Sequence, residues 1–249
     1  MRKVLLLILP LLVWACNKNA VTQNNDAKRL RKIVDSNSIS TTFNYDNQNK
    51  LINKTDTSVG STYKTYINVF YDSQGKISGY IYGDNQKGNI YSYTFNYTNG
   101  KIIRKVGAAI SDPIPPPTHG YSYDAEGRLF TDTIYFNQIP SVSYSKFFYS
   151  NGNITESQHF SNNSTVPDYI FKSSFDNNLT SCTVLDKNLY FVFEDQVFLN
   201  KNNVIETIDP ANSSNNTSIK IEFYPNKMPK KADYFLQGRT LFSTEYFYD

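Results

Sequence analysis

The chain has 249 residues, with 25 Lys and Arg against 22 Asp and Glu, and 15% of its residues are aromatic. This length suits one large β domain or two small ones, and so many aromatic side chains argue against a disordered chain. The balanced charge argues against a nucleic-acid-binding protein. The chain has two Cys and two His, so we expect neither a disulfide scaffold nor a zinc site. We also expect no cofactor.

The first residues have the pattern of a bacterial signal peptide. Arg2 and Lys3 form a short basic region, and residues 4–13 are almost wholly apolar. This apolar segment is too short to cross a bilayer as a helix, which needs about 20 apolar residues. We therefore expect residues 1–15 to be a signal peptide and not a membrane span.

The sequence Val-Trp-Ala-Cys at residues 13–16 ends this segment. It resembles the lipobox of bacterial lipoproteins, in which the Cys is diacylated on sulfur and becomes the first residue of the mature protein. The resemblance implies that Cys16 carries a lipid anchor. Because Asn17 and not Asp follows it, the resemblance also implies the outer membrane, with the periplasmic face and the cell surface both open. Residues 16–36 are then the lipidated Cys and a flexible tether, and residues 37–249 form a single domain.

Aromatic residues recur at a fixed interval of 26 residues through the remaining chain. The anchor positions are Tyr45, Tyr71, Tyr97, Tyr123, Tyr149 and Phe175. Weaker copies follow at residues 199–204 and 224–228. A fixed period of roughly 20–50 residues is typical of repeat architectures, in which each copy is one supersecondary unit.

Each copy predicts a β-hairpin, because Tyr-Asp-x-x-Gly-Lys-Ile combines the end of a strand, a turn and a new strand. Asp begins a type I turn by accepting a backbone hydrogen bond, and Gly takes the left-handed position that follows. In the shorter copies, Asn-Gly pairs predict two-residue type I′ turns. We assign a structural role to the anchor aromatics and to these turn residues: Asp46, Asp72, Gly75, Gly100, Asp124, Gly127, Gly152 and Asp176.

Residues 91–97 alternate aromatic with small polar side chains, which is the period of a half-buried β-strand. Each repeat supplies two such strands, so we expect an all-β, antiparallel meander of about 16 strands in sequence order. A meander of this length curls or closes into a barrel-like sheet, because strand twist accumulates and open edges invite aggregation.

The copy Tyr-Asp-Ala-Glu-Gly-Arg-Leu at residues 123–129 resembles the YD repeat of the Rhs and teneurin shell proteins, whose long arrays enclose a cargo domain. This chain has too few copies to enclose a folded toxin. With its lipobox, its many Asn residues and its Tyr and Phe repeats, it is more similar to Bacteroidetes lipoproteins whose YD-like repeats form a domain of unknown function with a porin-like β fold. That resemblance implies a fold and a location, but no activity and no catalytic residue.

Few residues suggest catalysis. We expect His119 in a loop, after a run of prolines, and His159 on a strand, and neither has a nucleophile motif beside it. Glu194 and Asp195 are adjacent, so on a strand they would face opposite sides. Cys182 lacks the basic setting that activates a thiol. We therefore expect no catalytic residues, no metal site and no enzyme.

The sequence thus favours a lipid-anchored, non-enzymatic scaffold or binding module of the outer membrane, with a glycan or a protein as its ligand. Two alternatives stay open: an integral outer-membrane β-barrel, and a surface lipoprotein that binds or processes glycans. Tyrosines can stack on sugars, but their fixed register favours a role in the hairpin framework. An integral barrel needs an outward apolar band, whereas the predicted apolar face is rich in Tyr and Phe and poor in aliphatic residues.

Overall fold

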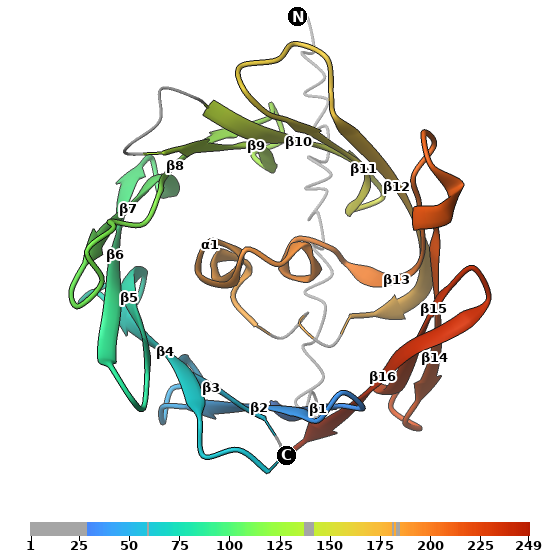
Figure 1. The fold of residues 1–249 in the computed structure, drawn as a ribbon, viewed down its shortest axis with the longest axis horizontal. Coiled ribbons are helices and arrows are strands. Elements are labelled where there is room, and N and C mark those ends of the chain that lie inside the picture. The colour runs from blue at the N-terminus through green and yellow to red at the C-terminus, as the bar shows by residue number, and fades with distance from the viewer. Residues whose placement is uncertain (1–28, 59, 137–141, 181, 183–184) are drawn as a thin grey trace, which may run out of the picture.

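The computed structural model describes residues 29–58, 60–136, 142–180, 182 and 185–249. Within these ranges, sixteen antiparallel strands form one closed barrel (Figure 1). Each strand pairs with the next along the chain, and the last strand, β16 (Arg239–Tyr248), pairs with the first, β1 (Leu30–Asp35). The predicted all-β antiparallel meander, closed on itself, is confirmed.

The strands between these two have lengths from 6 to 11 residues. They are β2 (Ile39–Tyr45), β3 (Leu51–Ser58), β4 (Lys64–Tyr71), β5 (Ile77–Asp84), β6 (Gly88–Thr98), β7 (Lys101–Ala109), β8 (Thr118–Tyr123), β9 (Leu129–Tyr135), β10 (Val142–Ser150), β11 (Asn153–Phe160), β12 (Tyr169–Leu179), β13 (Asn202–Ile208), β14 (Thr217–Phe223) and β15 (Pro229–Leu236). The described helices are short: η1 (Lys187–Leu189), α1 (Tyr190–Phe193), η2 (Gln196–Phe198) and η3 (Ser213–Asn215). In the described ranges, no helix has the length and apolar character needed to cross a membrane.

The barrel begins earlier in the chain than the sequence predicted. Ile33 pairs with Thr41 of β2 and with Tyr246 of β16, so β1 occupies residues that we assigned to the tether, and the predicted domain start at residue 37 is wrong. The physical reason is closure, because without β1 the edges of β2 and β16 would be unpaired. Cys16 and the predicted signal peptide lie outside the described residues.

The turns of the repeat are held by an Asp side chain and by a residue in the left-handed conformation. Asp72 Oδ1 accepts hydrogen bonds from the backbone N–H groups of Gln74 and Lys76, both at 2.9 Å, and Gly75 has a φ of +78°. Because this backbone conformation disfavours most side chains, Gly is the favoured residue there. The same features recur at Asp46 and Asp124, and both residues of the Asn-Gly pairs at 99–100 and 151–152 have positive φ, as type I′ turns require.

The anchor tyrosines connect each hairpin to the one before it. Tyr71 Oη donates a hydrogen bond to the backbone oxygen of Leu51 at 2.9 Å, and Lys50 Nζ lies 5.2 Å from the centre of the Tyr71 ring. Equivalent hydrogen bonds run from Tyr45 to Leu30, from Tyr97 to Ile77 and from Tyr123 to Ile102. The 26-residue period therefore places one Tyr hydroxyl on the backbone of the preceding repeat.

The sixth copy does not form a turn where the sequence predicted one. Phe175 and Asp176 lie inside β12, and the chain then enters the barrel before it returns as β13. Phe175 pairs with Val204, and Asp176 accepts a hydrogen bond from Asn203. The weak copy that we predicted at residues 199–204 is thus the return arm of the sixth hairpin, because an insertion occupies the turn. We call the described residues between β12 and β13, which are 180, 182 and 185–201, the internal segment.

The internal segment fills part of the barrel, and the apolar side chains of the wall point toward it. The ring centres of Tyr121 and Phe191 are 4.6 Å apart, and those of Phe147 and Tyr190 are 6.2 Å apart. Figure 1 shows α1 within the ring of strands. Each aromatic or aliphatic side chain buried in this way contributes roughly 1.5–3 kcal/mol. The hydrophobic core therefore lies inside the barrel, and the alternating wall residues face outward.

The outer face carries many polar side chains that bond to one another across strands. Asn44 Nδ2 donates to Asn53 Oδ1 at 3.1 Å, and Asn53 Nδ2 donates to Asn68 Oδ1 at 2.8 Å, which makes an amide ladder over β2, β3 and β4. On β15, Lys231 lies opposite a glutamate on each neighbouring strand. The wall is apolar toward its interior. Toward its surroundings it is polar along the middle of these strands, while exposed apolar side chains such as Ile103 lie near strand ends and in loops.

Candidate functional site

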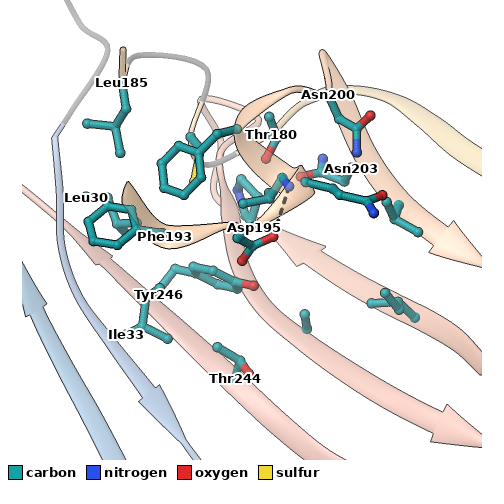
Figure 2. A pocket seen from close by; sticks show the side chains of 18 of the residues that line it. Leu30, Ile33, Thr180, Leu185, Phe193, Asp195, Asn200, Asn203, Thr244 and Tyr246 are labelled. Atoms are coloured by element: carbon teal, nitrogen blue, oxygen red, sulfur yellow. Dashed lines mark hydrogen bonds between the residues drawn. The ribbon is translucent and has the colours of Figure 1, made fainter. Parts of the chain in front are cut away.

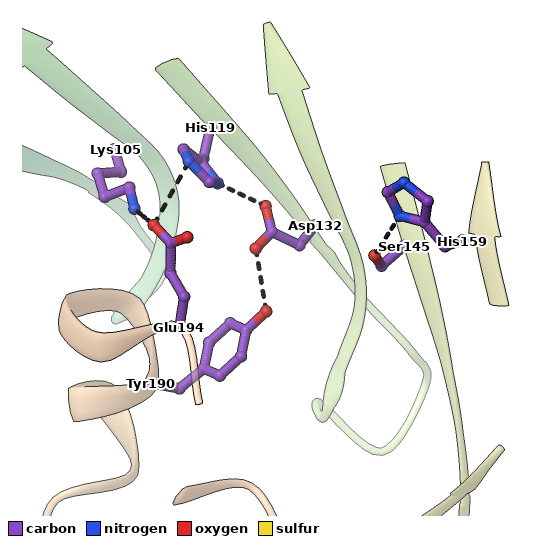
Figure 3. Close-up of polar contacts among 7 residues, drawn as sticks. All are labelled: Lys105, His119, Asp132, Ser145, His159, Tyr190 and Glu194. Carbon is purple, nitrogen blue, oxygen red and sulfur yellow. Dashed lines mark hydrogen bonds and ion pairs between the residues drawn. The ribbon is translucent and has the colours of Figure 1, made fainter. Parts of the chain in front are cut away.

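Two groups of residues inside the barrel have features of a functional site. The first is a set of polar side chains that join the internal segment to the wall, and the second is a cavity between that segment and other strands. We call the first group the polar cluster, and its members are Lys105, His119, Asp132, Tyr190 and Glu194 (Figure 3). We call the second the lumen cavity.

The polar cluster is a continuous chain of hydrogen bonds and ion pairs. Lys105 Nζ pairs with Glu194 Oε1, and His119 Nε2 lies 3.5 Å from the same oxygen. His119 Nδ1 is 2.9 Å from Asp132 Oδ1, and Tyr190 Oη donates to Asp132 Oδ2 at 3.0 Å. Burial raises the pKa of Tyr190 well above its ordinary value, so this hydroxyl remains a donor. The cluster thus joins α1 to three wall strands.

Neighbouring strands bring the wall members of the cluster together. Lys105 of β7 is opposite His119 of β8, and Asp132 of β9 is opposite Tyr121. Lys105 has no solvent exposure, whereas the side chain of Glu194 is 45% exposed. A buried ammonium group needs a compensating charge, and Glu194 supplies it.

The backbone of Glu194 carries strain that the cluster helps to maintain. Its φ is +56°, and it ends α1 in the left-handed conformation, with its N–H donating to the backbone oxygen of Tyr190 at 2.6 Å. A non-glycine residue in this conformation costs roughly 1–2 kcal/mol. The pairing of its carboxylate with Lys105 offsets this cost, so the cluster holds the internal segment in place.

The sequence did not predict these positions. His119 was expected in a loop but lies buried in β8, and Glu194 and Asp195 were expected on a strand but follow α1. Lys105 and Asp132 were missed. The sequence offered one signal, which is that Lys105 lies on the apolar face of β7. Lys105 shares this face with Ile102 only because of the β-bulge that follows Ile102, and the sequence did not predict that bulge.

The second histidine lies apart from the cluster. His159 of β11 faces the interior, with its Nδ1 3.3 Å from Ser145 Oγ. Among the described residues, no carboxylate bonds to the His159 ring, so this pair lacks the third group that orients a catalytic base. Within the described part of the chain, no three His, Cys, Asp or Glu side chains are grouped to hold a metal ion.

The lumen cavity has a volume of about 780 Å³ and lies between the internal segment and the wall on the side of β11 to β16 and β1 to β4 (Figure 2). Its lining is mostly apolar and includes Ile33, Phe43, Phe193, Ile219, Ala232 and Tyr246. Cys182, buried, also lines it. Cavities of this size and character inside β-barrels are typical of small-molecule binding sites.

Asp195 is the carboxylate that lines this cavity. It begins η2, where its Oδ1 accepts a hydrogen bond from the backbone N–H of Val197 at 3.0 Å. The residue is exposed to the lumen, but the protein that surrounds it on the barrel side partly desolvates the carboxylate and raises its pKa, while the Val197 bond and the charge of Lys54 oppose the increase. Lys54 Nζ itself pairs with Asp56 Oδ2 at 2.5 Å.

The structural residues predicted from the repeat lie at the barrel end where β1 begins, in the turns described above. Among them, Phe175 and Asp176 depart from the pattern, since they lie in β12. Cys16 lies outside the described residues, so its lipidation stays a prediction. None of the predicted repeat residues belongs to the polar cluster or lines the lumen cavity.

Two solved structures resemble this barrel over most of its length. One is a porin-like protein from Bacteroides uniformis, with a TM-score of 0.57 and 13% sequence identity, covering 88% of this chain and 95% of that chain. The other is a porin-like protein from Bacteroides vulgatus, with a TM-score of 0.58 and 12% identity, covering 89% of this chain and 99% of that chain. No protein-family model and no curated protein matches the chain. The predicted porin-like β fold is confirmed, and at this identity the similarity concerns the fold alone.

Proposed function

We propose that this chain is a non-enzymatic protein of the outer membrane, anchored through a lipid on Cys16, whose barrel lies in water and binds a small, largely apolar molecule in the lumen cavity. The observation that carries this proposal is the cavity itself, which lies between the wall and the internal segment, is partly open to solvent and has a mostly apolar lining. An apolar molecule gains free energy by leaving water for such a cavity. The members of the polar cluster bond to one another and join the internal segment to the wall, so in this proposal their role is structural.

An integral membrane barrel is the second candidate, and the porin-like neighbours favour it. Such a barrel needs an outward apolar band about 25 Å tall. Here the amide ladder of Asn44, Asn53 and Asn68 occupies the outer face, and exposed aromatic side chains such as Phe70 and Phe148 stand beside turns. The polar wall therefore favours a barrel in water over a barrel in lipid.

Membrane extraction separates these two candidates. Membranes from cells that produce the wild type or the Cys16→Ser variant are washed with alkaline carbonate, and the protein is followed by immunoblotting. We expect the wild type in the membrane fraction and Cys16→Ser in the soluble fraction. A Cys16→Ser variant that stays in the membrane would support the integral barrel and refute the lipid anchor.

Ligand binding is tested with N-phenyl-1-naphthylamine, an uncharged probe that fluoresces in apolar sites. Ala232 is buried and lines the cavity, so Ala232→Phe fills part of the volume and should weaken binding by about tenfold, equivalent to about 1.4 kcal/mol. Ala108→Phe is the matched control, because Ala108 is an exposed alanine of β7 that does not line the cavity. Equal affinities for the two variants, or no binding by the wild type, would reject the proposal.

A further inference from the structure

The charges around the lumen cavity leave one carboxylate without a counter-ion. Among the described residues that line the cavity, the charged side chains are Lys54 and Asp195. Lys54 is already paired with Asp56. Together these three groups carry one net negative charge, and the uncompensated group is Asp195.

The Asp195 carboxylate is fixed in position and has an oxygen available. Oδ1 is held by the Val197 N–H, because Asp195 caps the first turn of η2. Among the described residues, no donor bonds to Oδ2. Because Asp195 is exposed to the lumen, water can reach Oδ2 in the free protein, and a ligand donor that carries a positive charge is the partner that replaces this water most favourably.

The surroundings of Asp195 define the rest of the ligand. Figure 2 shows Leu30, Ile33, Phe193 and Tyr246 among the side chains that line the cavity together with Asp195. These side chains offer apolar surface and ring faces next to a single acidic group. A matching molecule has an apolar body and one cationic head.

We propose that the lumen cavity binds an amphipathic amine, with its ammonium group on Asp195 Oδ2 and its apolar body against Ile33 and Phe193. This inference rests on the function proposed above and adds the class of ligand. An amphipathic carboxylate fits less well, because its head would meet Asp195, and Lys54 is already neutralised by Asp56. A long-chain alcohol would fill the apolar part and donate a hydrogen bond, but would leave the charge uncompensated.

The test compares dodecylamine, dodecanol and dodecanoate, each below its micellar concentration, as competitors of N-phenyl-1-naphthylamine. For the wild type we expect dodecylamine to bind about tenfold more tightly than dodecanol, a difference of about 1.4 kcal/mol, and dodecanoate to bind most weakly. Asp195→Asn should abolish the preference for the amine, because dodecylamine then binds no more tightly than dodecanol. Asn also caps helices well, so this variant keeps the start of η2.

Asp168→Asn is the matched control, because it removes one negative charge from an exposed loop residue that does not line the cavity. It should bind all three competitors as the wild type does. If no competitor displaces the probe, or the probe does not bind, the proposed function itself fails. If all three bind equally, or if Asp195→Asn keeps the preference for dodecylamine, the cavity binds apolar molecules but the inference about their charge is wrong.

Discussion

The regular hairpins of the wall and the sixth hairpin are built from the same repeat but use it differently. In the wall, Tyr71 bonds to the preceding repeat and Gly75 allows a tight turn. In the sixth hairpin, Phe175 stands at the tyrosine position, and the internal segment replaces the turn. The comparison teaches that short-range contacts build the wall, while long-range contacts build the interior, and each can be disrupted separately.

The largest expected loss of stability comes from breaking the ion pair that joins the internal segment to the wall. Glu194→Gln leaves the Lys105 ammonium buried without its counter-charge. Breaking a fully buried pair costs about 3–5 kcal/mol, and because Glu194 is 45% exposed we expect a lower cost of about 2–3 kcal/mol in the free energy of unfolding. Urea denaturation measures it.

A double-mutant cycle distinguishes this cause from a loss of packing. Lys105→Met should cost less than Glu194→Gln, because the carboxylate left behind can be hydrated whereas the ammonium cannot. The double variant should be close in stability to Lys105→Met alone. If the two single effects simply add, the ion pair does not hold the internal segment.

The wall could be predicted from the sequence, and the interior could not, for a physical reason. A turn such as Asp72 to Lys76 is determined by residues four positions apart, so its pattern is visible locally. The contacts of the cluster join Lys105 to Glu194, 89 positions away, and Asp132 to Tyr190, 58 positions away. No pattern within a short stretch of sequence can indicate contacts between residues so far apart along the chain.

The same contrast explains the two errors of the prediction, one at the start of the domain and one in its sixth repeat. β1 pairs with β16 at the far end of the chain, and residues 30–35 mix three apolar with three charged side chains without strand alternation, so they gave no local sign that they form a strand. The internal segment begins just after a repeat-like sequence and ends in another, at residues 199–204, so the sequence resembled two further hairpins. In each case the partner strand lay too far along the chain to be inferred.

A medium effect is expected in the wall from removing one tyrosine hydroxyl. Tyr71→Phe leaves the backbone oxygen of Leu51 without the 2.9 Å hydrogen bond it accepts, which should lower the free energy of unfolding by about 1 kcal/mol. Tyr66→Phe is the control, because the Tyr66 hydroxyl bonds to the exposed side chain of Asn89 and water can replace it. A Tyr71→Phe variant as stable as Tyr66→Phe would show that the hydroxyl does not connect the repeats.

The smallest expected effect is a gain in stability, at a turn where the repeat departs from its own pattern. The turn from Tyr224 to Met228 has the regular backbone bonds, both at 2.9 Å, but Lys227 stands in the left-handed position with a φ of +64°. Gly occupies this position in the turn that contains Gly75. A lysine there costs roughly 1 kcal/mol, and the greater freedom of Gly in the unfolded chain cancels about half of the gain.

Lys227→Gly should therefore raise the free energy of unfolding by about 0.5 kcal/mol, and Gly75→Ala should lower it by about 1 kcal/mol. Effects of opposite sign at equivalent positions would establish that one turn rule governs the whole wall, whereas a loss of stability in Lys227→Gly would mean that the lysine side chain makes contacts that outweigh its backbone strain.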